Sequence, residues 1–425
     1  MSLASAVDVA IIGAGAAGLA AARRLATAPL SVALLEARDR VGGRAWTAQV
    51  GGFPQDLGAG WLHSADRNVW VEMIERLGFI LDKTPPPWAS QAGDQGFPKA
   101  EQAAFNEAYA AFDSRVSEAA AGPHDRPAAE LFEPGGRWNA LMDAVSSFYN
   151  GVEYACVSAK DYTAYLDTGT DWRVTQGYGA LVAAFGEDAP ATLDCEVTLI
   201  DRSGADLRLE TSQGELTTRA VIVAVPTPIL AEERLKFSPA LPEKLEAAAA
   251  LPLGCADKLL LELAKPEMFP QDGQLLGRTD STETAGYHLR PFGRPLIEAF
   301  FGGALAEALE AEGERAFAAF ALDELSNLIG SSVRKRLTPL RATRWGVDPF
   351  ARGAYSYARV GCAPLREALA APVEDRLFFA GEACSPTAFS TAHGAYETGV
   401  RAAEAVLTAL QVGNAGVVAS DDFSP

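Results

Sequence analysis

Three glycines near the amino end have a spacing that suits phosphate binding. Gly13, Gly15 and Gly18 form a G-x-G-x-x-G pattern directly after the apolar run VDVAII. Such a pattern brings backbone N–H groups close to a pyrophosphate at a helix N-terminus. Glu36 ends the next apolar run, close to the distance at which an acid would accept hydrogen bonds from an adenosine ribose. Residues 7–44 therefore predict a βαβ unit that binds a dinucleotide, with close helix packing as the alternative reading of the glycines.

The residues that follow Glu36 decide between the dinucleotides NAD and FAD. They read E-A-R-D-R-V-G-G-R and include Arg38, Gly43 and Arg44. The glycine pair lets the backbone pass a second phosphate region, and the Arg44 guanidinium can pair with phosphate oxygens. A solvated basic turn is the alternative for the arginines. The stretch resembles the FAD signature of the flavin-containing amine oxidase superfamily.

The stretch FAGEACSPTAFSTAHGAYETG near the carboxyl end resembles the second FAD fingerprint of the same family. The resemblance implies that Gly381 and Glu382 lie near the FAD phosphates and that a helix from Thr391 points at the flavin. A helix N-terminus carries about half a positive charge, which stabilises the negative charge of reduced flavin. A plain helix packed on a sheet is the alternative. Four further residues are predicted to contact the cofactor: Gly60, Trp61, Val197 and Trp345.

A third segment, TRWGVDPFARGAYSYARVG, is similar to the W-x-x-D-P-x-x-x-G-[ST]-Y-S stretch of polyamine oxidases and lysine-specific histone demethylases. The resemblance implies that Tyr355 stands before the flavin and steers an amine with its apolar wall and cation-attracting face. By spacing alone, Tyr355 and Tyr357 would be alternating strand residues. Thr391 aligns with the second aromatic position of monoamine oxidases, so a full aromatic sandwich is not expected.

Two further side chains are candidates for catalysis. Lys258 leads into an apolar run in GCADKLLLEL, and a family lysine at this position holds a water near flavin N5 and assists the reaction with oxygen. A lysine at the start of a strand is otherwise usually solvated. His63 follows LGAGWL, where polyamine oxidases resembling spermine oxidase carry a histidine that lines the substrate tunnel. A core or surface role is the alternative for a single histidine.

Covalent flavin and a metal are both predicted to be absent. The five cysteines form no C-x-x-C pair, and none matches the covalent attachment point of monoamine oxidases, so we expect non-covalent FAD and reduced thiols. The sequence contains no H-E-x-x-H, EF-hand or G-x-S-x-G pattern. No metal site is therefore predicted.

The patterns that position these residues predict an α/β fold. Its first part is a doubly wound FAD-binding domain of the Rossmann type, assembled from residues 1–62, 190–240 and 346–412. Its second part is an α+β substrate domain, with a mixed sheet flanked by helices, from residues 63–189 and 241–345. The polar residues 413–425 are predicted to be a disordered tail.

Length, composition and net charge limit the domain organisation and the kinds of binding partner that are expected. The 425 residues exceed what a single core usually holds, which agrees with two domains. The net charge of −19 argues against nucleic acid and would favour a cationic substrate, although solubility explains an acidic surface equally well. The amino end has no signal-peptide pattern and no window approaches a membrane span, so a cytoplasmic location is expected. The oligomeric state is open.

The resemblance implies an FAD-dependent amine oxidase. Hydride would pass from the amine α-carbon to flavin N5, the imine would hydrolyse, and O2 would reoxidise the flavin to give H2O2. Polyamines are the expected substrates because of His63, Tyr355 and the acidic charge. An L-amino acid oxidase or a flavin desaturase on the same scaffold is the alternative, and a pocket arginine among Arg173, Arg290 and Arg344 would favour the former. A non-catalytic FAD-binding scaffold is the third reading.

Overall fold

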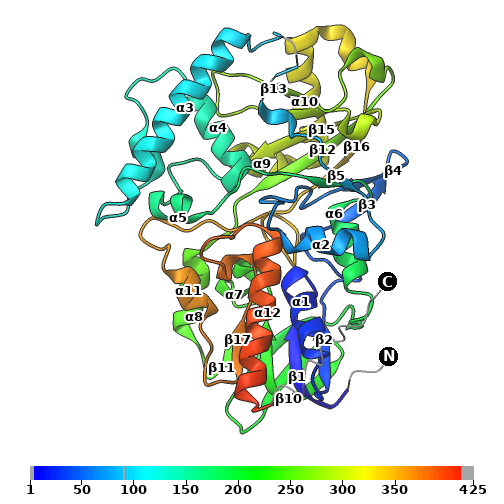
Figure 1. Ribbon diagram of the computed structural model, residues 1–425, viewed down its shortest axis with the longest axis vertical. Helices are drawn as coiled ribbons and strands as arrows, with labels where there is room; N and C mark the ends of the chain where they lie inside the picture. The colour runs from blue at the N-terminus through cyan, green and yellow to red at the C-terminus, as the bar shows by residue number, and fades with distance from the viewer. Residues whose placement is uncertain (1–3, 90, 93, 413–425) are drawn as a thin grey trace, which may run out of the picture.

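The computed structural model describes residues 4–89, 91–92 and 94–412, so the predicted disorder of the tail lies outside the described residues. Figure 1 shows two sheet regions stacked along the long axis of the molecule, with β1 (Ala6–Ile12) and α12 (Ala392–Ala409) both in the lower region. Within the described residues, none of the helices combines the length and the apolar character that crossing a membrane requires.

The lower region contains an eight-stranded sheet in the order β11-β8-β9-β10-β1-β2-β7, with β17 beside β10. The central strand β1 pairs in parallel with β2 and β10, whereas β9 pairs antiparallel with β10, so the sheet is mixed. Its strands are β1 (Ala6–Ile12), β2 (Val32–Leu35), β7 (Ala191–Thr192), β8 (Val197–Asp201), β9 (Leu207–Thr211), β10 (Gly214–Val223), β11 (Lys236–Ser238) and β17 (Leu377–Phe379).

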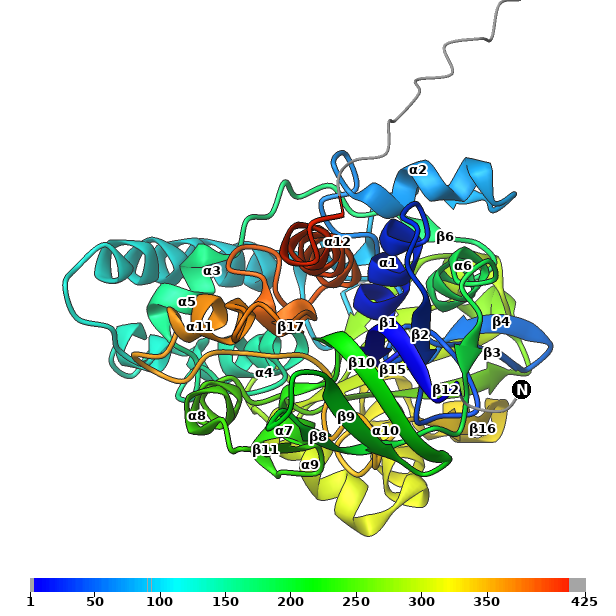
Figure 2. The same cartoon turned by 90° about the horizontal axis from the view of Figure 1, so that it is seen from below.

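Both faces of this sheet are covered, which confirms the doubly wound α/β fold. Val9 and Ile11 of β1 pack in one apolar cluster with the helices α1 (Ala16–Leu25) and α12 (Ala392–Ala409), whereas Ala10 and Ile12 point into a second cluster. A strand places successive side chains on opposite faces, so an apolar run is expected where both faces are buried. Figure 2 shows α1 and α12 side by side on one face. The helices packed on the other face are α7 (Thr227–Ala231), α8 (Pro242–Ala250) and α11 (Leu365–Ala370).

The upper region contains a five-stranded sheet in the order β13-β14-β15-β12-β16, and each pairing in it is antiparallel. The mixed pairing of the molecule therefore lies in the first sheet. The strands are β12 (Ala256–Leu263), β13 (Gly273–Leu276), β14 (Gly286–Leu289), β15 (Leu296–Gly302) and β16 (Leu337–Ala342). Leu259, Leu261 and Phe301 pack against α9 (Gly303–Glu312) and α10 (Glu314–Ile329). The opposite face, which includes Lys258 and Glu298, borders the candidate site.

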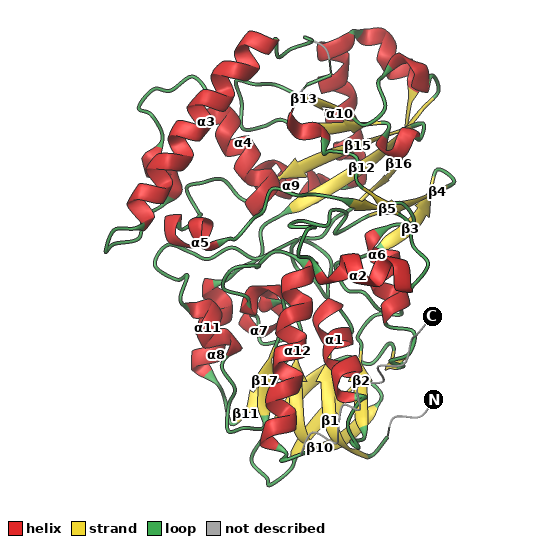
Figure 3. Cartoon of the chain, viewed as in Figure 1, coloured by secondary structure: helices red, strands yellow, loops and turns green. Residues whose placement is uncertain are grey.

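The remaining helices divide between two apolar clusters. Figure 3 shows α3 (Lys99–Ala120), α4 (Asn139–Asn150) and α5 (Ala159–Ala164) grouped beside the second sheet. The helices α2 (Val69–Arg76) and α6 (Tyr178–Phe185) instead bury Trp70, Met73 and Phe185 in the cluster that covers α1. Both helices lie within 63–189, the segment that the sequence assigns to the substrate domain. That domain division remains a prediction.

Two further sheets have two strands each. One is the hairpin of β3 (Thr47–Val50) and β4 (Phe53–Asp56), and the other pairs β5 (Leu81–Asp82) with β6 (Arg173–Val174). The strands β5 and β6 are far apart in the sequence, and their pairing places Arg173 opposite Asp82.

Candidate active site

The loop between β1 and α1 packs its backbone so closely that Gly13 and Gly18 have no room for a side chain. Gly13 has φ of +99°, and a Cβ there would lie 2.6 Å from the carbonyl oxygen of Ala224. A Cβ on Gly18 would lie 1.8 Å from the carbonyl oxygen of Gly13. Among the described residues, no side chain caps the first turn of α1, whose N-cap is Gly15. The N–H groups of that turn are therefore available to a bound anion.

Glu36 lies at the end of β2 beside this loop and is buried. Its carboxylate accepts hydrogen bonds from the backbone N–H of Ala14 at 2.7 Å and of Arg38 at 2.9 Å. Burial raises the pKa of Glu36 above its ordinary value, although these two donors oppose the shift. The structure thus places the acid next to the glycines, where the sequence predicts it.

The basic turn after Glu36 pairs with distant parts of the chain. Arg38 forms two hydrogen bonds with Asp348, at 2.9 and 2.6 Å. Arg44 donates to Glu382 at 2.9 Å and to the carbonyl oxygen of Ala354 at 2.7 Å. The two predicted FAD fingerprints are therefore joined directly. The prediction that Arg44 pairs with phosphate remains untested, and such a contact would use its remaining N–H groups.

Glu382 follows β17 and is buried among hydrogen-bond donors. Burial favours the neutral acid, but Arg44 and Ser356 outweigh it, so the pKa of Glu382 lies below its ordinary value and the group is ionised. The preceding Gly381 has φ of +135° and its N–H donates to Thr398 of α12 at 2.9 Å. Glu382 is therefore an anchor for neighbouring segments of the chain.

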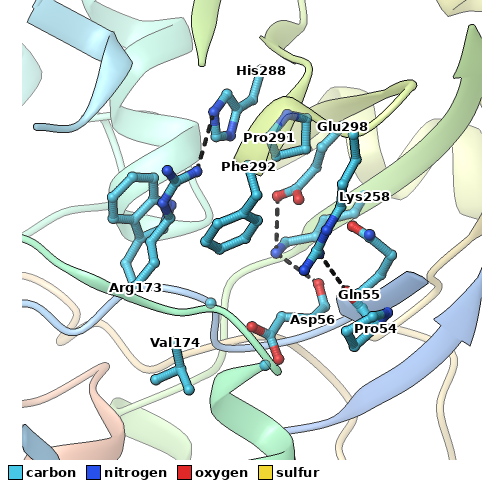
Figure 4. Close-up of a pocket in the computed structure, with 14 residues that line it drawn as sticks. Pro54, Gln55, Asp56, Arg173, Val174, Lys258, His288, Pro291, Phe292 and Glu298 are labelled. Atoms are coloured by element: carbon cyan, nitrogen blue, oxygen red, sulfur yellow. Dashed lines mark hydrogen bonds and ion pairs between the residues drawn. The ribbon is translucent and has the colours of Figure 1, made fainter. Parts of the chain in front are cut away.

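Lys258 lies at the wall of a cavity between the upper sheet and the β3–β4 hairpin (Figure 4). Its ammonium donates to the carbonyl oxygen of Asp56 at 2.9 Å and lies 3.0 Å from a carboxylate oxygen of Glu298. The side chain of Lys258 is only 7% exposed. Burial would raise the pKa of Glu298, but Lys258 lowers it below its ordinary value, so the pair is ionic. One ammonium N–H remains for a water or a ligand.

The cavity is small, with a volume of about 30 Å³, and it has aromatic and charged walls. Gly60 and Trp61, both predicted cofactor contacts, lie along it. At the far end, the guanidinium of Arg173 lies 5.0 Å from the Trp61 ring and 4.1 Å from the Phe292 ring. The other lining residues are Pro54, Gln55, Asp56, Val174, Gly177, Lys258, His288, Pro291, Arg294 and Glu298.

Tyr355 and Thr391 are not among the residues that line this cavity. The Tyr355 hydroxyl donates to the carbonyl oxygen of Phe148, and its own carbonyl oxygen accepts from the N–H of Gly254 at 2.9 Å. Thr391 caps α12: its hydroxyl accepts from the N–H of Gly394 at 3.0 Å and donates to the carbonyl oxygen of Ala388 at 2.6 Å. Thr391 therefore orients the start of α12.

The remaining predicted residues are placed as follows. His63 pairs with Asp171 at 2.7 Å and has a side chain that is 38% exposed. Trp345 donates from Nε1 to the carbonyl oxygen of Leu57 at 2.9 Å and packs edge-on against Trp46. Val197 is buried in the second apolar cluster of the lower sheet, away from the cavity.

The family model described as flavin containing amine oxidoreductase matches residues 16–91 and 99–407. The chain belongs to this family.

Individual relatives agree with this assignment. Polyamine oxidase 2 of Arabidopsis thaliana is 31% identical, and the match covers 93% of this chain and 87% of the relative. Lysine-specific histone demethylase 2 of Homo sapiens is 27% identical over 94% of this chain and 53% of its own length. The fold is similar to that of putrescine oxidase bound to putrescine, with a TM-score of 0.77, 19% identity and coverage of 96% and 100%. Cyclohexylamine oxidase from Brevibacterium oxydans gives a TM-score of 0.76, 21% identity and coverage of 95% and 99%.

The residues present fit the flavin cofactor that this flavin amine oxidoreductase family implies. Among the described residues, no side chain caps the N-terminus of α1, so backbone N–H groups of its first turn remain for a pyrophosphate. Glu36 lies beside this turn and accepts from the N–H of Ala14. Glu382 is linked to the glycine loop by Arg44. Arg44 donates to Glu382, and the preceding residue, Gly43, packs on Gly15.

Sequence reasoning did not find several residues that line the cavity or pair with a predicted site residue. Glu298 pairs with Lys258, and Asp171 pairs with His63. Glu298 does carry a signal, because it is the acid in the otherwise apolar run LIEAFFG. His288 and Phe292 have no comparable signal, since only the pairing of β14 with β15 brings them to the cavity.

A buried group of potential metal ligands lies behind Trp345. One ligand atom from each of Cys255, Asp257 and Glu310 falls within 4.8 Å of the others. Asp257 accepts from the N–H of Trp345 at 3.0 Å, and Glu310 accepts from the N–H of Gly346 at 2.7 Å. Burial and the neighbouring Asp257 raise the pKa of Glu310 to about 8. Glu310 is therefore protonated at neutral pH, and the two carboxyl groups hold the loop that carries Trp345.

Proposed function

We propose that this protein is an amine oxidase that binds FAD without a covalent bond and oxidises a polyamine or a related amine. The observation that carries the proposal is the buried ammonium of Lys258, held by Glu298 and the Asp56 carbonyl beside Gly60 and Trp61. FAD supplies, when bound, the acceptance of a hydride from the amine α-carbon and the later return of electrons to O2 to give H2O2.

The protein groups position and desolvate the amine. Lys258 pairs with the Glu298 carboxylate and offers the site a hydrogen-bond donor and a fixed positive charge. Tyr355 offers an aromatic wall to the amine. His63 is held through Nδ1 by Asp171, which leaves its other ring nitrogen free for a substrate group.

The arginines support an amine without a carboxylate. Arg173, which lines the cavity, donates to Asp272 at 2.8 Å and to Asp82 at 2.6 Å. Arg290 donates to the carbonyl oxygen of Phe269, and Arg344 to that of Glu310. An amino acid oxidase needs a guanidinium fork that is free for the substrate carboxylate. Arg173 is already held by two carboxylates, Arg290 and Arg344 do not line the cavity, and the polyamine and putrescine oxidases among the relatives support the same choice.

The deciding experiment mixes the purified protein anaerobically with polyamines, aromatic monoamines and L-amino acids, and then admits oxygen. We expect a yellow protein whose flavin is released by acid, is bleached by polyamines, and yields peroxide when oxygen enters. Peroxide from amino acids alone would reject the proposed substrate. A flavin that no amine bleaches would favour the non-catalytic scaffold, and a colourless protein without flavin affinity would overturn the proposal.

A further inference from the structure

A buried network of four side chains runs beneath Tyr355. It consists of Asp161 on α5, Arg366 on α11, Ser356 in the loop after Tyr355, and Glu382 after β17. Arg366 holds Asp161 with two hydrogen bonds of 2.7 and 2.8 Å and donates to the Ser356 hydroxyl at 2.8 Å. That hydroxyl donates to Glu382 at 2.5 Å. All four residues are at most 5% exposed.

The network and Arg44 form hydrogen bonds with the backbone on both sides of Tyr355. Asp161 accepts from the N–H of Ala358 at 2.8 Å. Arg44, itself bound to Glu382, donates to the carbonyl oxygen of Ala354 at 2.7 Å. Tyr355 thus lies in a short segment whose two ends are fixed by buried charges.

The same network reaches the start of α12. Glu382 accepts from the N–H of Ser390 at 2.9 Å, and the Ser390 hydroxyl donates to the carbonyl oxygen of Ser356 at 2.7 Å. Ser390 precedes Thr391, the N-cap of α12. The guanidinium of Arg366 also lies 3.8 Å from the centre of the Phe389 ring. One cluster therefore sets both Tyr355 and Thr391.

Stability alone is a poor explanation for this arrangement. Burying a guanidinium and two carboxylates has a large desolvation cost, and apolar residues of similar volume usually stabilise a core as well or better. A fully satisfied polar network, in contrast, specifies one geometry. The desolvation cost of these buried charges is therefore explained if the position of the Tyr355 segment matters for function.

We propose that Ser356 and Arg366 are positioning residues: through Asp161 and Glu382 they fix where Tyr355 stands in the amine site. The proposal rests on the proposed function, because Tyr355 is an active-site residue only if the protein oxidises amines.

The test uses Ser356→Ala, which removes the link between Arg366 and Glu382 but leaves Arg366 paired with Asp161 and Glu382 paired with Arg44. Thr284→Val is the matched control. The Thr284 hydroxyl is equally buried and donates to the buried carboxylate of Glu324 at 2.9 Å, in the upper region away from the cavity. Both variants lose one hydroxyl–carboxylate hydrogen bond, and Ser356→Ala also loses the hydrogen bond from Arg366, so its loss of Tm is expected to be at least as large as that of the control.

We expect Ser356→Ala to lower the rate of anaerobic flavin reduction at saturating polyamine about tenfold, since small displacements of a positioning group have effects of this order or larger. The visible circular dichroism of the bound flavin should change as well. Neither quantity should move in Thr284→Val. A wild-type rate of flavin reduction and an unchanged spectrum in Ser356→Ala, whatever its loss of Tm, would overturn the proposal.

Two further measurements complete the test. If Ser356→Ala does not fold, Arg366→Lys, which retains the charge but not the fork that reaches both Asp161 and Ser356, is measured in the same way with the same expected outcome. Amide hydrogen exchange of residues 354–358 in the flavin-free protein reports positioning without any turnover. Faster exchange in Ser356→Ala but not in Thr284→Val supports the proposal, and equal exchange contradicts it. A wild-type flavin that no amine bleaches would instead reject the proposed function.

Discussion

At the residue scale, Lys258 shows how a charge is kept inside the molecule. It is followed in β12 by three leucines, and its side chain is almost fully buried. A buried charge without a partner has a large desolvation cost. Glu298, on the neighbouring strand β15, offsets this cost by forming the ion pair.

Lys258→Met should slow the reaction of reduced enzyme with O2 more than it slows flavin reduction, because the fixed positive charge and its free N–H are lost. Stopped-flow mixing of reduced enzyme with oxygen measures the first rate, and anaerobic mixing with amine measures the second. Lys244→Met is the matched control, since Lys244 is also buried but donates to the carbonyl oxygens of Ala368 and Leu369. Equal reoxidation in Lys258→Met and wild type would remove Lys258 from this step.

Glu310 gives the protein a pH-dependent stability. Its pKa is raised to about 8 in the folded state from an ordinary value of 4.5, so the folded protein binds more protons than the unfolded chain between these values. The free energy of unfolding therefore falls as the pH rises through this window.

Glu310→Gln should remove this loss, because glutamine retains an oxygen for the Gly346 N–H and has no proton to release. Thermal unfolding at pH 5 should differ little from wild type, whereas at pH 8 the variant should melt higher by roughly 2 °C or more. Glu312→Gln, an exposed change at the end of the same helix, should leave the pH dependence of Tm unaltered. Parallel curves for Glu310→Gln and wild type would contradict the assignment.

At the element scale, the crossing of α1 and α12 sets the glycine loop. Gly399 of α12 lies against the first turn of α1, and a Cβ there would lie 2.1 Å from the carbonyl oxygen of Ala17. Gly399→Ala must therefore push the two helices apart. We expect a destabilisation of about 1–3 kcal/mol together with weaker FAD binding, because the open N-terminus of α1 moves with its first turn.

The measurements are thermal unfolding and FAD titration by flavin fluorescence. Glu397→Ala, on the exposed face of α12, is the control and should change neither quantity. If Gly399→Ala lost stability but kept the wild-type FAD affinity, the helix crossing would not set the cofactor loop.

At the scale of the whole molecule, the cofactor site joins the two ends of the chain. Glu36 follows the second strand and contacts Ala14 of the glycine loop. Glu382 precedes the last helix and pairs with Arg44, whose neighbour Gly43 packs on Gly15 of the same loop. A ligand that contacts both should stabilise the complete fold by mass action, by about 2.7 kcal/mol at one hundred times its dissociation constant.

We expect FAD to raise the Tm of the flavin-free protein more than FMN does at the same concentration, because FMN lacks the adenosine that Glu36 is predicted to bind. Differential scanning fluorimetry measures both shifts, and Glu36→Gln should narrow the difference between them. An equal rise with FMN and FAD would contradict the predicted adenosine site at Glu36.

The sequence by itself determined the parts of the fold that depend on local chemistry. The apolar runs, the glycines at 13, 15 and 18 and the acid at 36 specify a βαβ unit because turn geometry and strand alternation act over a few residues. The second FAD fingerprint, at Gly381 and Glu382, was predicted from the sequence because the stretch FAGEACSPTAFSTAHGAYETG resembles the family motif.

Only the tertiary structure decided which charges meet. Arg44 and Glu382 are 338 residues apart, and Lys258 and Glu298 lie on different strands of the upper sheet. Ion pairs of this kind depend on strand order and on the contact between the two regions, which no local pattern encodes. The physical reason is that a buried charge must find its partner in space, and the fold of the whole chain determines what lies within reach.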